Sequence, residues 1–171
     1  TMDTFFGVGG VTIADLRGHA GFPDAPDASL VVPTLEAPRD RADNYGVRLR
    51  AFLVPWRTGE YTFWIASDDN GELWIAPDAD PAGVVRVAHV PGWTDWRQWD
   101  RFGEQRSAPI ALEAGEAVFV EALMKEEGGG DHLSIAWALG DGAPALIDAA
   151  SLFTEAPPAE PEAGAPEQRF V

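Results

Sequence analysis

Two segments of the sequence carry the residue types that bind hard cations. The first is Ser67-Asp68-Asp69-Asn70-Gly71, and the second runs from Lys125 to His132 and contains Gly128, Gly129, Gly130 and Asp131. Calcium accepts carboxylates and backbone carbonyls as ligands at flexible angles, and consecutive glycines free a backbone to turn its carbonyls inward. We therefore expect Asp68, Asp69 and Asp131 to gather one calcium ion, with the glycine loop completing its shell.

The first segment also has a simpler interpretation as a tight turn. Asn-Gly between alternating apolar residues is a strong β-hairpin signal, and aspartates are common beside such turns. Taken alone, Asn70-Gly71 favours a hairpin over a ligand site. Neighbouring aspartates on a regular strand point to opposite faces, so both reach one ion only if the backbone between them departs from strand geometry. We therefore hypothesise a cis peptide bond between Asp68 and Asp69.

Strands must position both segments, because the chain from Gly46 to Leu139 alternates apolar and polar residues. A period of two is the pattern of half-buried strands. On one of these strands, Val118, Val120, Ala122 and Met124 share a face. Strands are expected over 47–53, 61–65, 73–75, 84–90, 118–124 and 133–137.

Turn residues separate these strands at short intervals. They include Pro55, Thr58-Gly59, Pro91-Gly92 and Ala114-Gly115. Short strands broken this regularly predict an all-β fold, an antiparallel β-sandwich. Short helical turns are expected only as additions, around Trp93 to Arg101 and around Ile147 to Phe153.

The composition predicts one folded domain followed by a tail. The chain has 171 residues, of which 46% are apolar and 11% aromatic, enough material for a single core. The end of the chain is rich in Ala, Pro and Glu, which is typical of an extended linker, although a frayed terminus fits nearly as well. We assign 1–154 to the domain and 155–171 to the linker or tail.

The charge and the missing motifs exclude several classes of function. A net charge of −16 repels nucleic acid and anionic membrane surfaces. No apolar run reaches the roughly 18 residues that a membrane span needs, so direct membrane insertion is not expected. Zinc ligand spacings, phosphate-binding loops and the Gly-x-Ser-x-Gly elbow are missing from the sequence. Cations or neutral ligands are the expected partners.

Two longer stretches resemble the protective-antigen-type (PA-14) domain family. They are YGVRLRAFLVPWRTGEYTFWIASDDNGELWI and WTDWRQWDRFGEQRSAPIALEAGEAVFVEALMKEEGGGDHLSIAW, and the likeness extends over about Phe5 to Phe153. The Gly-x-Tyr-x-Phe strand, the SDDNGELW segment and the KE-GGGD loop carry it in combination. The resemblance implies a lectin-like β-sandwich of the kind found in bacterial adhesins, yeast flocculins and glycosidase accessory modules, where several members bind sugars through calcium.

The resemblance also implies which residues bind the metal and the sugar. In the sugar-binding members a cis-linked aspartate pair lies in the first calcium loop, and this pair falls on Asp68 and Asp69. The second loop adds carbonyls and a side chain, which fall on Gly128 to Gly130 and on Asp131. Two neighbouring sugar hydroxyls would then replace waters on the ion. Glu127 either joins the shell or faces solvent, and the residues expected on the rim are Trp74, Trp93, Trp96, Gln98 and His132, although tryptophans in a sandwich more often pack in the core.

These observations predict a calcium-dependent carbohydrate-binding module and no enzyme. We expect a monomeric module within a larger multidomain adhesin on a bacterial cell surface, which binds cell-surface glycans with sugars such as fucose or glucose. The alternatives that stay open are an accessory or catalytic domain of a glycoside hydrolase and a structural spacer. A catalytic domain would use two of the carboxylates of Asp68, Asp69, Glu126 and Glu127. Replacing Asp68 or Asp131 by alanine is expected to weaken metal and sugar binding together and to leave the sandwich folded.

Overall fold

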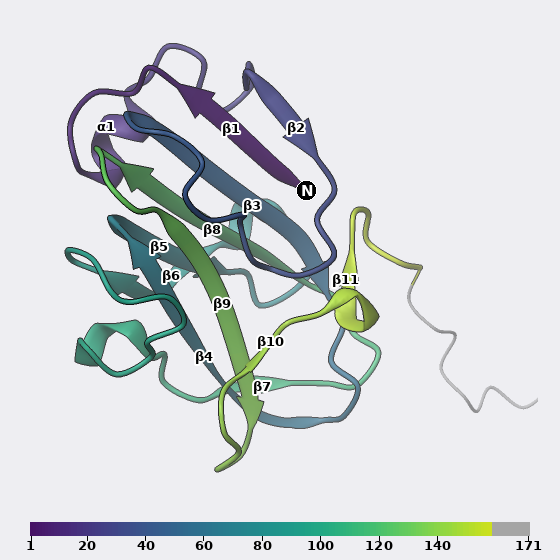
Figure 1. The fold of residues 1–171 in the computed structure, drawn as a ribbon. Helices are drawn as coiled ribbons and strands as arrows, with labels where there is room; N and C mark the ends of the chain where they lie inside the picture. The colour runs from purple at the N-terminus through teal and green to yellow at the C-terminus, as the bar shows by residue number, and fades with distance from the viewer. Residues whose placement is uncertain (159–171) are drawn as a thin grey trace, which may run out of the picture.

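The computed structural model describes residues 1–158, which form two antiparallel sheets packed face to face (Figure 1). The larger sheet has the strand order β2-β1-β3-β8-β5-β6, and β11 also pairs with β3. The smaller sheet has the order β10-β9-β4-β7. The predicted antiparallel β-sandwich is therefore confirmed. Most of the expected tail, 155–171, lies outside the described residues, so its assignment as a linker stays a prediction.

All of the strands expected from the alternating pattern are present, most of them longer than expected. They are β3 (Tyr45–Leu53), β4 (Gly59–Asp68), β5 (Asn70–Ile75), β6 (Val85–Val90), β8 (Val118–Glu126) and β9 (His132–Leu139). The others were not expected, and most of them are too short to show an alternating pattern. They are β1 (Met2–Phe6), β2 (Ala28–Leu30), β7 (Ile110–Leu112), β10 (Ala145–Leu146) and β11 (Leu152–Phe153).

The core lies between the two sheets and follows the period of two. Val47, Leu49 and Leu53 of β3 face Phe63 and Ile65 of β4 across this layer, and all five side chains are fully buried. Each such side chain contributes about 1.5–3 kcal/mol when removed from water. The apolar layer therefore fixes the register of the strands, and with it the ends at which the acidic residues lie.

The helical segments are short, as expected, but only one of the two predicted positions contains one. A 3-10 turn, η3 (Ala149–Ser151), lies within the second predicted segment. The prediction for Trp93 to Arg101 is wrong, because the turn η2 (Gly103–Gln105) follows that segment instead. One further 3-10 turn, η1 (Pro81–Gly83), precedes β6. Among the described residues, no helix is long and apolar enough to cross a membrane.

One α-helix, α1 (Ile13–Arg17), was not expected from the sequence. The Thr12 side chain and the Asp15 side chain form a capping box at its first turn, which satisfies backbone N–H groups that a helix otherwise leaves free. Its buried residues Ile13 and Leu16 pack against Leu123 on the outer face of β8. A helix of five residues is stable only through such packing.

The segment between Asp68 and Gly71 is not a β-hairpin, so that interpretation of the Asn-Gly pair is wrong. Asp68 ends β4 and Asn70 begins β5, yet β4 belongs to the smaller sheet and β5 to the larger. The glycine serves close packing, because a Cβ atom on Gly71 would lie 2.7 Å from the Ser67 side chain. The chain thus crosses from one sheet to the other at the two aspartates.

Candidate functional site

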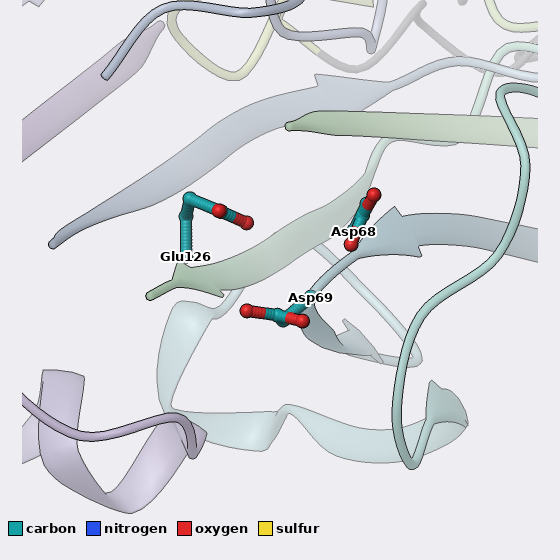
Figure 2. Close-up of side chains that lie close together, drawn as sticks. All are labelled: Asp68, Asp69 and Glu126. Carbon is teal, nitrogen blue, oxygen red and sulfur yellow. The ribbon is translucent and has the colours of Figure 1, made fainter. Parts of the chain in front are cut away.

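Three carboxylates meet where β4 and β8 end. One carboxylate oxygen from each of Asp68, Asp69 and Glu126 lies within 4.8 Å of the other two. Figure 2 shows the three side chains gathered from the β4–β5 crossing and from the last residue of β8. The peptide bond between Asp68 and Asp69 is cis, as hypothesised from the sequence. We call these three residues the acidic cluster.

Glu126 is the buried member of the acidic cluster. It continues the inward-facing series of Ala122 and Met124 on β8, so its side chain points between the sheets and is fully buried. Neither of its carboxylate oxygens has a hydrogen-bond partner among the described residues. Burial, together with the nearby charges of Asp69 and Asp68, raises its pKa to about 7. A buried carboxylate without partners is costly, which makes this the position where a cation would contribute most.

The two aspartates are half-buried and differ in their contacts. Asp69 Oδ2 accepts a hydrogen bond from the backbone N–H of Glu127 at 3.1 Å, which ties the β4–β5 crossing to the glycine loop. Burial and then the neighbouring charges of Asp69 and Asp131 raise the pKa of Asp68 to about 6. Like charges this close disfavour ionisation. The cluster as a whole therefore favours either protons or a cation.

These raised pKa values predict that protons stabilise the fold when no cation is bound to the acidic cluster. Carboxyl groups in an unfolded chain titrate near pH 4, whereas Asp68 and Glu126 hold protons up to about 6 and about 7 when folded. In a chelator, these two carboxyls should therefore lower the melting temperature as the pH rises from about 5 to about 8, and the lowered pKa of His132 opposes this only in the lower part of the range. If the acidic cluster binds calcium, as expected from the sequence, this fall should disappear in calcium, because carboxylates bind a cation more tightly once their protons have left. Calorimetric scans across this pH range measure the melting temperature. A melting temperature that does not change with pH in chelator would contradict the prediction.

Asp131 is buried and already engaged by three donors. Its Oδ1 accepts a hydrogen bond from the Tyr45 hydroxyl at 2.6 Å, and its Oδ2 accepts from the backbone N–H groups of Arg41 at 2.6 Å and Ala42 at 3.2 Å. Hydrogen bonding to Asp131 and burial raise the pKa of Tyr45, burial being the larger cause. Asp131 lies close enough to raise the pKa values of Asp68 and Glu126. It borders the acidic cluster and holds the loop before β3 in place.

The glycine loop packs against that same loop. Gly129 has a φ of 120°, a conformation that favours glycine, and its N–H donates to Asp43 Oδ1 at 3.2 Å. The Asp40 carboxylate faces Gly130, since a Cβ atom there would lie 3.3 Å from its Oδ1. Glu127 is exposed, and its carbonyl accepts a hydrogen bond from Asn44 N–H. The glycine loop is therefore fixed from two sides, by Asp69 and by residues 40–44.

His132 is buried and anchors a neighbouring loop. Its Nε2 lies 2.9 Å from the carbonyl oxygen of Thr94, to which a protonated Nε2 donates, and only 4% of the residue is exposed. Burial lowers its pKa, which favours the neutral ring. Thr94 N–H in turn donates to Ser67 O at 2.9 Å. The loop over 91–102, which we call the rim loop, is thus attached directly beside Asp68 and Asp131.

The remaining residues expected on the rim divide between two places. Trp93 and Trp96 are exposed on the rim loop, where Arg101 lies over Trp93 and Arg97 over Trp96. Gln98 supports the turn of that loop, because its Oε1 accepts from Asp95 N–H at 3.1 Å. Trp74 is elsewhere: it lies on the outer face of β5, under Arg17, and its Nε1 donates to Glu72. The structure does not bring Trp74 to the acidic cluster.

Sequence reasoning missed two parts of this site. Glu126 was considered only as a catalytic carboxylate, although the series Val118, Val120, Ala122 and Met124 places it on the buried face. The loop over 39–44 gave no signal, because its contacts with Asp131 join residues about ninety positions apart and no local pattern reports them.

A family model described as PA14 domain matches residues 27–151. Among curated proteins, the mouse N-acetyl-beta-glucosaminyl-glycoprotein 4-beta-N-acetylgalactosaminyltransferase 1 is 35% identical over 133 residues, which cover 75% of this chain and 13% of that protein. Mouse fibrocystin is 30% identical over 103 residues, covering 54% of this chain and 2% of that protein. The chain therefore spans only a small part of the length of the curated relatives that it matches.

Solved structures share the fold at low sequence identity. A structure described as the PA14 sugar-binding domain from RTX adhesin has a TM-score of 0.64 at 14% identity, covering 88% of this chain and 95% of that one. The A domain of epithelial adhesin 6 from Candida glabrata, in complex with Galb1-3GlcNAc, has a TM-score of 0.60 at 12% identity, covering 92% and 87%. The PA14 domain of the MpAFP antifreeze protein has a TM-score of 0.61 at 16% identity, covering 88% and 87%.

Proposed function

Because this chain belongs to the PA14 domain family, we propose that it is a calcium-dependent carbohydrate-binding module. The observation that carries the proposal is the buried Glu126 carboxylate. Its two oxygens have no partner among the described residues, and one of them lies within 4.8 Å of a carboxylate oxygen of Asp68 and of one of Asp69. Three carboxylates this close repel one another unless a cation or protons compensate them. The residues present therefore fit a divalent metal.

The chemistry of the donors favours calcium. Asp68, Asp69 and Glu126 offer only carboxylate oxygens, which suit a hard cation, and the nearby histidine, His132, faces the carbonyl of Thr94 instead. Asp131 and the carbonyls of Gly128 to Gly130 complete the proposed set of ligands. The tie between Asp69 and the Glu127 N–H holds the two ligand segments at a fixed separation.

Carbohydrate is proposed as the ligand because of the likeness to sugar-binding structures and because of the exposed rim. When bound, calcium supplies coordination positions that two neighbouring sugar hydroxyls can occupy. Around it, Trp93 and Trp96 provide exposed aromatic surface, which packs on the apolar face of a pyranose ring. One neighbour is described as a sugar-binding domain and another as a complex with Galb1-3GlcNAc.

We further propose that the module acts without catalysis, outside the cell, as part of a longer adhesive protein. The adhesins among the structural neighbours support this setting. A bacterial cell surface is the proposed location, and a monomer the proposed state of the module.

Binding to immobilised sugars tests the proposed function. Glucose, fucose, galactose and mannose are each coupled to a surface, and binding is measured in millimolar calcium and in chelator. At least one sugar is expected to bind in calcium and to be released by chelator, and chromatography after long incubation should find the sugar intact. Binding that survives chelation would refute the calcium bridge, and released products would identify a hydrolase instead. If the protein binds no glycan on a wider array, the result would favour the alternative that the module is a structural spacer.

A further inference from the structure

A polar groove lies on the outer face of the larger sheet and is lined by Asn70, the residue that follows Asp69 of the acidic cluster. It lies where the ends of β5 and β6 face the first turn of α1, and its volume is about 330 Å³. Ligand pockets in proteins commonly have volumes of about 300–1,000 Å³. Its lining includes Thr12, Ala14, Asn70, Glu72, His89 and Pro91.

Strand geometry explains why polar side chains line this groove. Gly71 points inward, because a Cβ atom there would meet Ser67 and Ile65 between the sheets. Its neighbours Asn70 and Glu72 must therefore project from the outer face, since side chains alternate along a strand. His89 is the direct partner of Glu72 across the β5–β6 pair, so it projects on the same side.

The polar groups of the groove are partly committed and partly free. Glu72 accepts hydrogen bonds from Arg86 at 2.8 Å and from Trp74 at 3.1 Å, so its charge is compensated. The Asn70 amide and the His89 ring form no side-chain hydrogen bond within the described part of the chain, and both residues are half-buried. The groove thus offers an amide and an imidazole beside the apolar surface of Pro91, a combination suited to a sugar.

The groove lies near the acidic cluster, because Asn70, which lines it, is bonded to Asp69 in the chain. We infer that this groove binds a second, neutral sugar residue, joined to the sugar held at the calcium ion, so that the preferred ligand is an oligosaccharide. This inference rests on the proposed function. The Asn70 amide and the His89 ring are expected to bond hydroxyls of the second residue, while the α1 surface at Ala14 forms the opposite wall.

Comparison of monosaccharides with disaccharides tests the inference on the calcium-loaded protein. Titration calorimetry would use glucose, fucose, galactose and mannose, and then maltose, cellobiose, lactose, Galβ1-3GlcNAc, Fucα1-2Gal and Manα1-2Man, which carry those sugars at the terminus. For the monosaccharide that binds, a disaccharide should bind about tenfold more tightly, equivalent to about 1.4 kcal/mol.

Two variants assign that gain to the groove. His89→Ala removes one free polar group, and Ala14→Trp fills the groove from an exposed helical position. Both are expected to lose most of the gain while keeping the wild-type affinity for calcium and for the monosaccharide. Ala111→Trp, at an exposed position on β7 of the other sheet, is the matched control and should keep the gain.

The outcomes separate this inference from the proposed function. If a monosaccharide binds but no disaccharide exceeds it by more than twofold, the inference is wrong and the proposed function stands. If the gain survives both groove variants, or is lost in Trp93→Ala alone, the second residue lies along the rim loop and the groove is refuted. If no sugar binds in calcium, the proposed function itself fails.

Discussion

Glu126→Gln is expected to weaken calcium binding by at least about 100-fold, equivalent to about 2.7 kcal/mol, because it removes the buried charge of the acidic cluster. The neutral amide keeps the shape of the side chain but no longer attracts a cation. In chelator the same change should raise stability at neutral pH, on the order of 1–3 kcal/mol, since a charged carboxylate without partners is replaced. Titration calorimetry measures the first effect and thermal unfolding the second.

Opposite signs in these two measurements distinguish a metal ligand from a structural carboxylate. If Glu126→Gln lowers stability in chelator, then the Glu126 carboxylate has protein partners. If the variant keeps the wild-type affinity for calcium, then the ion binds elsewhere. Glu116→Gln is the matched control, because Glu116 is an exposed carboxylate just before β8 and should change neither quantity.

Asp131→Ala is expected to destabilise the fold by about 3–5 kcal/mol, which revises the expectation drawn from the sequence. The change leaves the Tyr45 hydroxyl and the N–H groups of Arg41 and Ala42 without their acceptor. Hydrogen bonds to a charged group contribute about 1.5–3 kcal/mol each. Relief of the repulsion between Asp131 and the acidic cluster offsets part of the loss. The melting temperature should fall by about 10 °C.

Thermal unfolding in chelator isolates this structural role of Asp131 from any role in metal binding. Tyr45→Phe removes one of the three donors and should cost about 1–3 kcal/mol, less than Asp131→Ala. If Asp131→Ala leaves the melting temperature in chelator unchanged and lowers only calcium affinity, the residue acts as a ligand alone.

The fold could be predicted well from the sequence because its strands bury one face. Alternation over β3, β4 and β8 is a local signal, and the apolar layer between the sheets requires it. The short strands at the edges and α1 depend on packing against residues far away in the chain, so they left no comparable pattern.

The candidate site was predictable only where its residues are neighbours in sequence. Asp68 and Asp69 stand together, and a departure from strand geometry follows from that alone. Glu126 could have been predicted only by extending the alternating pattern of β8 by one more inward-facing residue. The hydrogen bonds that Asp131 accepts from Arg41, Ala42 and Tyr45 join positions far apart in the sequence, so only the three-dimensional structure reveals them.

The attachment of the rim loop has a consequence for engineering. Thr94 within the rim loop bonds to Ser67, and buried Gln105, just after the loop, bonds through its side chain to the carbonyl of Ile65. These two points fix the segment to consecutive inward positions of β4. The amino acids between these two points include Trp96 and Arg101, which face solvent. Exposed positions such as these can therefore be randomised, and selection from such a library would alter ligand preference while Thr94 and Gln105 keep the loop attached.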